Sequence, residues 1–196
     1  MRDRLVFAAG GLAAVLAVSP PVDALAHENL VWHMAQHLVL LVVAAPLLVL
    51  GGMRAWRAAT RPVPLPLVVT LVAAHVVVVA AWHLPPLFDA TERSLPLHAA
   101  EHLSFLAAAT GLWWAAGLGT RPATPVASLA VFVASLPGIA LGAAMTMATQ
   151  PWYQQYPSLI DQQVAGALMW SVGGAATVLC GVLSLVRSLS VWEAAG

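Results

Sequence analysis

The feature that most constrains this chain is a series of long apolar stretches separated by proline, glycine and charged residues. A helix of about twenty apolar residues crosses the hydrocarbon core of a bilayer. Five stretches have that length and a sixth is shorter: Leu30 to Leu50, Pro64 to Leu84, Leu97 to Leu118, Pro125 to Thr149 and Leu159 to Arg187, with Leu5 to Val18 as the short one. The sequence therefore predicts an all-α, polytopic transmembrane bundle of about six helices, forming a single domain over residues 1–196.

Composition agrees with a membrane protein and narrows the classes of function. Hydrophobic residues make up 61% of the chain and charged residues 8%, against about half and about a quarter in soluble domains. The net charge is zero and no basic cluster occurs, so the lipid bilayer is an expected partner and nucleic acid is not. The single Cys180 excludes internal disulfides and metal sites built from paired cysteines. Any metal must therefore be held by histidine, methionine or carboxylate side chains.

The short first stretch allows two interpretations. Arg2 and Arg4, the apolar stretch that follows and the sequence Ala24-Leu25-Ala26 have the layout of a secretory signal with a cleavage site. Counted from Met1 to Ser19, the same segment would form a helix of about 28 Å, which just spans a bilayer. Its arginines would then reach the interface.

The arginines predict the orientation of the helices, because arginine in short loops stays on the cytoplasmic side. With a cytoplasmic N-terminus only Arg93 lies outside, and the other seven lie inside: Arg2, Arg4, Arg54, Arg57, Arg61, Arg121 and Arg187. The same topology places most histidines at the outer face: His27, His33, His37, His83, His98 and His102. Only His75 is expected deeper in the bilayer.

The histidines follow a pattern typical of a metal site. HMAQH and HAAEH each place two imidazoles one turn apart on one helix face, and His83 ends another span in WHLPP. Imidazole suits copper, zinc, iron and nickel, and nearby methionine thioethers favour Cu(I), so we predict copper, with Cu(I) favoured. The candidate ligands are His33, His37, His83, His98 and His102, with Glu101 as an orienting partner and Asp161, Gln162, Met145 and Met147 as auxiliary residues.

A structural role is the alternative for each of these residues. Interfacial histidines can hydrogen-bond between helices or face water, although this explains one histidine more easily than all six. His75 lies about 12 Å deeper than His83, so we expect a buried structural hydrogen bond there. Cys180, near the inner end of the last span, is interpreted as a packing residue.

Four segments resemble one known family as a set. SPPVDALAHENLVWHMAQHLVLLVVAAPLLVLG, WHLPPLFDA, LHAAEHLSFLAAATGLWW and DQQVAGALMW are similar, in order, to the CtaG-type cytochrome c oxidase assembly factors of bacteria. The resemblance implies a multi-pass protein of the bacterial plasma membrane that helps to mature a copper-containing haem oxidase. Its partners would be an apo-oxidase subunit and other copper chaperones. The positions that match the family's motifs are His33, His37, His83, His98, Glu101, His102, Asp161 and Gln162.

The chain departs from the family at its N-terminus. Family members usually carry a further helix ahead of the segment similar to SPPVDALA, so we expect a shorter N-terminal region here, which leaves the total number of helices open. In the family the matching Ala-Leu-Ala lies in a retained external loop, which argues against cleavage after Ala26.

Three classes of function fit the sequence. The first is a copper-binding assembly factor that aids insertion of copper into an oxidase. The second is a copper transport or resistance protein, which needs a polar path through the bilayer. His75 is the single ionisable residue expected well inside the helices, and one residue does not make a path. The third is a membrane cytochrome with a haem between paired imidazoles. An enzyme is not expected, because HEXXH is absent and no nucleophile accompanies the histidines.

Overall fold

The protein is a bundle of long helices in the computed structural model, which describes residues 1–56, 63–116 and 125–193. Every regular element in these ranges is helical, so the all-α prediction is confirmed. Arg57, Arg61 and Arg121, which contributed to the predicted orientation, lie outside the described residues, as does Leu118, a predicted span end.

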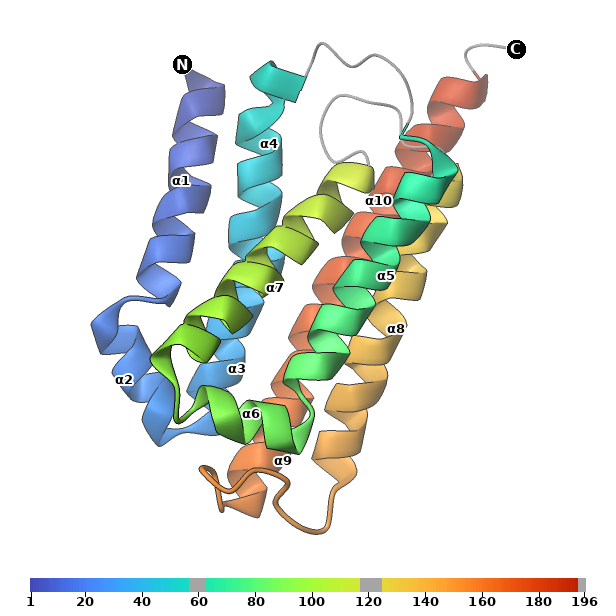
Figure 1. The fold of residues 1–196 in the computed structure, drawn as a ribbon. Coiled ribbons are helices and arrows are strands. Elements are labelled where there is room, and N and C mark those ends of the chain that lie inside the picture. Colours follow the sequence, from blue (N-terminus) through green and yellow to red (C-terminus); the bar gives the residue numbers. More distant parts are fainter. Residues whose placement is uncertain (57–62, 117–124, 194–196) are drawn as a thin grey trace.

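The long helices run up and down the bundle (Figure 1). In chain order the helices are α1 (Arg2–Ala17), α2 (Pro20–Glu28), α3 (Leu30–Leu38), η1 (Val39–Ala44), α4 (Ala45–Trp56), α5 (Leu65–Trp82), α6 (Pro85–Thr91), α7 (Leu95–Ala115), α8 (Pro125–Met147), α9 (Leu159–Leu168), η2 (Met169–Gly173) and α10 (Gly174–Glu193). The short helices α2 and α6 lie at the end opposite the two chain termini, together with α9 and the loop before it. We call this the closed end of the bundle.

The predicted number of about six membrane spans is not confirmed. Within the described residues, four segments are long and apolar enough to cross a membrane: Leu30–Gly52, Leu65–Trp82, Pro125–Met147 and Leu159–Val186. A fifth is added if α1 and α2, which are bent by 48° relative to each other, form one broken span. The 21 residues of α7 have the length to cross, at about 31 Å, but His98, Glu101 and His102 lower its apolar character.

Prolines set where the chain turns at the closed end. α2, α6 and α7 each have proline within their first two positions, where the missing N–H and fixed φ suit a helix start. Pro85 and Pro86 follow His83 so closely that α5 stops at this histidine, which is its C-cap residue. The sequence WHLPP thus holds His83 at the closed end.

Glycines allow close approach of neighbouring helices. A Cβ built on Gly142 of α8 would lie 2.9 Å from Gly166 O of α9, and one on Gly166 would lie 2.6 Å from Gly142 O. The same kind of contact joins α1 to α4, where a Cβ on Gly10 would lie 2.8 Å from Leu48 N. Small residues are the usual means of close packing between membrane helices.

Gly10 and its neighbour Gly11 offer a matched test of the contact between α1 and α4. Gly10→Ala should lower the thermal stability of the detergent-purified protein, by about 1–3 kcal/mol, because the new methyl group meets backbone atoms. Gly11→Ala should leave stability unchanged or slightly higher, because nothing lies within 4 Å of its Cβ position and alanine favours helix. Equal destabilisation by both changes would contradict the observed packing of α1.

Candidate metal centre

Two pairs of histidines from α3 and α7 face each other at the closed end. The ring centroids of His33 and His37 lie 4.4 Å apart, and those of His98 and His102 lie 4.3 Å apart. Between the helices, His37 and His102 are separated by 5.3 Å. All four residues are at most 6% exposed. The structure therefore brings both HxxxH motifs into one buried site.

Two further histidines border these pairs. The ring of His83 lies 6.2 Å from that of His37, and the ring of His27 on α2 lies 5.4 Å from that of His98. His83 Nδ1 lies 2.7 Å from Val79 O, so a neutral His83 ring donates from Nδ1 and keeps the lone pair on Nε2. We refer to His27, His33, His37, His83, His98 and His102 as the histidine cluster.

Two buried carboxylates lie among the imidazoles. Glu101 is fully buried; its Oε1 lies 3.6 Å from His37 Nε2 and its Oε2 lies 3.7 Å from His98 Nδ1. The side chain of Glu92, the residue that follows α6, is 1% exposed, and its Oε1 lies 3.4 Å from His33 Nδ1. Glu101 thus touches one histidine from each pair, as expected for an orienting or ligating carboxylate.

Asp23 of α2 fixes the orientation of His98. His98 Nε2 lies 3.0 Å from Asp23 Oδ1 and donates its proton there, which leaves the lone pair on Nδ1. That nitrogen faces Glu101 and, at 3.9 Å, Glu92 Oε1. A carboxylate that binds one ring nitrogen and leaves the other free is the usual support of a metal-ligating histidine.

The loop before α9 closes the site through Tyr156. Its hydroxyl lies 2.6 Å from Ala26 O, 3.2 Å from Glu92 Oε2 and 3.4 Å from His33 Nδ1. The single hydroxyl proton serves one acceptor at a time, so these groups form one shared network. Burial raises the pKa of the Glu92 carboxyl and of the Tyr156 hydroxyl.

Many ligand atoms in the cluster are buried without a hydrogen bond. Within the described residues they are His33 Nε2, His37 Nδ1 and Nε2, His83 Nε2, His98 Nδ1, His102 Nε2, Glu92 Oε1, and both Oε1 and Oε2 of Glu101. Leaving one buried polar atom unpaired costs about 1–3 kcal/mol, and more for a charged group. So many unpaired nitrogen and oxygen atoms in one place form a candidate donor set for a metal ion.

Distances place five of these residues in two groups. His33, His37 and Glu101 offer ligand atoms that all lie within 4.8 Å of one another, and so do His98, Glu101 and His102. The residues of both groups are buried. Sets of three protein ligands also occur in metal sites that keep one position open.

Asp161 and Gln162 support the site from outside it. The Asp161 carboxylate accepts hydrogen bonds from Leu30 N at 2.7 Å and Val31 N at 3.3 Å, which caps the helix that carries His33 and His37. Gln162 Oε1 accepts from Trp152 N at 2.6 Å and its Nε2 donates to Gln150 O. Both residues therefore hold backbone in place.

The two predicted methionines lie in different surroundings. Met145 is buried in a hydrophobic cluster with Leu30, Met34 and Phe88, and Met147 is 80% exposed at the end of α8. The donors that the structure gathers are thus nitrogen and oxygen atoms.

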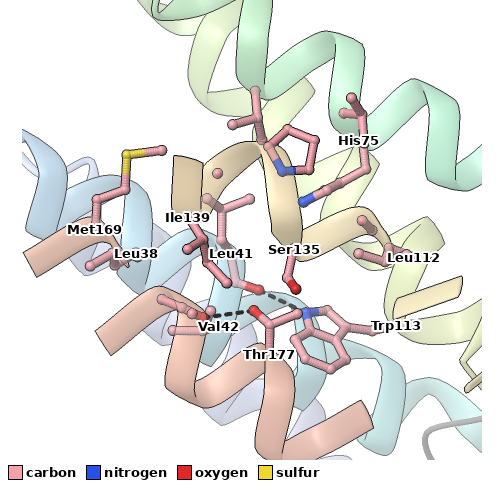
Figure 2. A pocket seen from close by; sticks show the side chains of 17 residues that line it. Leu38, Leu41, Val42, His75, Leu112, Trp113, Ser135, Ile139, Met169 and Thr177 are labelled. Atoms are coloured by element: carbon pink, nitrogen blue, oxygen red, sulfur yellow. Dashed lines mark hydrogen bonds between the residues drawn. The ribbon is translucent and has the colours of Figure 1, made fainter. Parts of the chain in front are cut away.

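His75 lies apart from the cluster, beside a cavity of about 70 Å³ in the middle of the bundle (Figure 2). Its Nδ1 is buried without a hydrogen-bond partner, so the expected structural hydrogen bond is not seen at that atom. The π-helical segments η1 and η2 contribute Leu41, Val42, Met169 and Gly173 to the wall.

Trp113 fills part of this irregular region. Its Nε1 donates to Leu41 O at 2.7 Å, as Figure 2 shows. A π-helical turn leaves carbonyl groups without their usual α-helical partners, and the indole satisfies one of them. The remaining wall is mostly apolar, with Ser135 and Thr177 as its polar members beside His75. The cavity is thus a small internal space between helices.

Sequence reasoning missed Asp23, Glu92 and Tyr156. Asp23 and His27 are four residues apart on α2, and the spacing alone could have shown that they share a helix face. Glu92 follows α6 and Tyr156 lies in the loop before α9, far apart in the sequence. Only the packing of the closed end brings them next to the histidines.

Comparison with known proteins supports the resemblance seen in the motifs. The family model described as cytochrome c oxidase caa3 assembly factor (Caa3_CtaG) matches residues 1–190. Neither a curated protein nor a solved structure matches the chain.

Removing the Asp161 cap tests its effect on α3. Asp161→Ala should lower the free energy of unfolding by about 0.5–2 kcal/mol, the usual range for loss of a helix cap, measured by thermal unfolding in detergent. Ile160→Ala is the matched control, because Ile160 precedes it on α9 and is 73% exposed. A loss of stability for Ile160→Ala as large as that for Asp161→Ala would contradict the capping role.

Proposed function

We propose, because the chain belongs to the cytochrome c oxidase caa3 assembly factor family, that its histidine cluster binds copper and aids copper insertion into an oxidase. The family places the protein in oxidase assembly, and its apolar helices are those of a multi-pass membrane protein. In this proposal it resides in the bacterial plasma membrane, acts without catalysis and receives or passes copper through contact with an apo-oxidase subunit or another copper chaperone.

The observation that carries the proposal is the set of buried, unpaired imidazole and carboxylate atoms at the closed end. A polar site that lacks partners inside an apolar bundle is unfavourable unless a ligand completes it. Imidazole nitrogen binds copper well. The resemblance of the sequence motifs implies that the oxidase served by this family contains copper. The preference for the oxidation state Cu(I) remains a prediction from the sequence.

The arginine distribution supports an outer position for the cluster. α1 starts with Arg2 and Arg4 at the end of the bundle opposite the histidines. Arginine prefers the cytoplasmic side, so the closed end faces outward in this proposal. A metal site there can exchange copper with extracytoplasmic partners without moving an ion through the bilayer.

The polarity of the bundle favours assembly over transport. Beyond the histidine cluster, the described helices offer His75, the hydrogen-bonded pair Ser128 and Ser184, and a small cavity whose wall is mainly apolar. Moving a copper ion past such a wall would require it to shed its ligands in a medium of low dielectric constant, which is very costly. A one-sided site therefore fits a chaperone better than a channel.

The haem alternative meets an obstacle in the geometry. A haem requires a flat space between two facing imidazoles, whereas Glu101 lies between His37 and His98 and contacts both. Phe105 also packs on His37 at 4.6 Å between ring centroids. An absorption spectrum of the purified protein distinguishes haem, with its Soret band, from copper.

Substituting one histidine from each pair tests copper binding. The double change His37→Ala and His102→Ala should remove bound copper from the purified protein and lower oxidase activity in membranes, because both donor groups lose a ligand. Metal analysis and oxygen consumption measure the two effects, with protein level checked by immunoblot. Cys180→Ala should change neither quantity; copper loss in this variant, with copper retained in the double variant, would sink the histidine site.

Gene deletion separates assembly from transport. Loss of the protein should lower the copper content and activity of the oxidase while total cytoplasmic copper stays constant, because a one-sided site moves no copper inward or outward. Cell fractionation with metal analysis measures both pools. If cytoplasmic copper changed several-fold and the oxidase defect followed it, the protein would be a transporter.

A further inference from the structure

The histidine cluster has more donors than one metal ion can use. Bonds from a metal to imidazole nitrogen are about 2 Å long, and sites of four ligands are common. The site contains the six imidazoles of the histidine cluster and the carboxylates of Asp23, Glu92 and Glu101. Asp23 and Tyr156 form hydrogen bonds with some of these atoms. Within the described residues, nine nitrogen and oxygen atoms of these histidines and of Glu92 and Glu101 remain without a hydrogen bond.

Five of the residues with unpaired donors fall into two groups with a single shared member. One group is His33 and His37 with Glu101, and the other is His98 and His102 with Glu101. Each pair lies on one helix, and the two oxygens of Glu101 are directed to different helices: Oε1 lies near His37 and Oε2 near His98. A carboxylate in this position can give one oxygen to each of two ions.

From this geometry we propose that the protein holds two metal ions bridged by Glu101, one ligated by His33 and His37 and the other by His98 and His102. The inference rests on the proposed copper function and specifies its stoichiometry. Glu101 is the bridging ligand, and Asp23 is a positioning residue that acts through His98. Glu92 Oε1 lies 3.4 Å from His33 Nδ1 and 3.9 Å from His98 Nδ1, so Glu92 contacts one histidine from each group.

The two positions differ in access. A groove of about 440 Å³ between α1, η1 and α7 is lined by Asp23, His98 and His102 together with apolar residues, and His33 and His37 are not part of its wall. The ion at His98 and His102 therefore borders an open space, and the ion at His33 and His37 is enclosed. Each position thus has its own surroundings, as two separate sites require.

Copper titration of the purified full-length protein tests the inference. Under anaerobic reducing conditions, with a chromophoric Cu(I) chelator as competitor, the wild-type protein should bind two copper ions per chain. His37→Ala and His102→Ala should each reduce this to one, because each change removes a ligand of one position only. Circular dichroism and size-exclusion chromatography check that the variants are folded.

Spectroscopy of the Cu(II)-loaded protein provides a second measurement that does not depend on counting bound copper ions. Two Cu(II) ions on one carboxylate should show magnetic coupling in electron paramagnetic resonance, and each single histidine variant should show an isolated Cu(II) signal. Glu101→Gln should weaken both positions and abolish the coupling. Asp89→Asn is the matched control, since Asp89 is a buried carboxylate that binds Gln154 N, and it should keep two coupled ions.

The outcomes separate this inference from the function on which it rests. Saturation of the wild-type protein at one copper ion, with that ion lost in either histidine variant, would overturn the bridged pair and leave the copper proposal standing. Failure of the wild-type protein to bind any copper would overturn both.

Discussion

Placing a group of imidazoles and carboxylates inside an apolar bundle is the constraint on which the closed end of this protein depends. In a medium of low dielectric constant an unpaired polar group is costly, and a paired one is held firmly. Each element at this end supplies a partner: α2 gives Asp23, the end of α6 gives Glu92 and the loop before α9 gives Tyr156. The short helices and this loop therefore close the bundle by giving His33 and His98 polar partners.

The donors that lack such partners are the basis for proposing a ligand site here. A purely structural network would pair its buried atoms, as Asp161 does with the start of α3 and Gln162 does with the loop backbone. Among the residues that the structure describes, the ring nitrogens of His37 and the carboxylate oxygens of Glu101 are buried atoms without a hydrogen-bond partner of good geometry. They lie at the contact between α3 and α7, so an ion bound there would also hold these two helices together.

Under the proposed copper function, membership of an oxidase assembly family gives a one-sided arrangement of donors a purpose. A protein that passes on a metal needs ligands that bind it and a face from which it can leave, and it has no need of a path across the membrane. The described helices show polar donors at one end and a mainly apolar interior around His75. This gradient follows from the cost of polar groups in hydrocarbon, which limits them to positions where function requires them.

The sequence by itself determined the helical class, the family and the histidine pairs, because apolar length and the i, i+4 spacing are local properties of the chain. It predicted about six apolar spans, a number that is not confirmed, because within the described residues four segments, or five with the bent pair of α1 and α2, are long and apolar enough to cross a membrane. It also assigned Asp161 and Gln162 to the site region without their role, and it missed Asp23, Glu92 and Tyr156. Only the tertiary structure decided these points, because Tyr156 and Glu92, or Asp161 and Leu30, are far apart in the chain and meet only when the helices pack. Which oxygen of Glu101 faces which histidine depends in the same way on how α3 and α7 approach each other, and no local pattern encodes that distance.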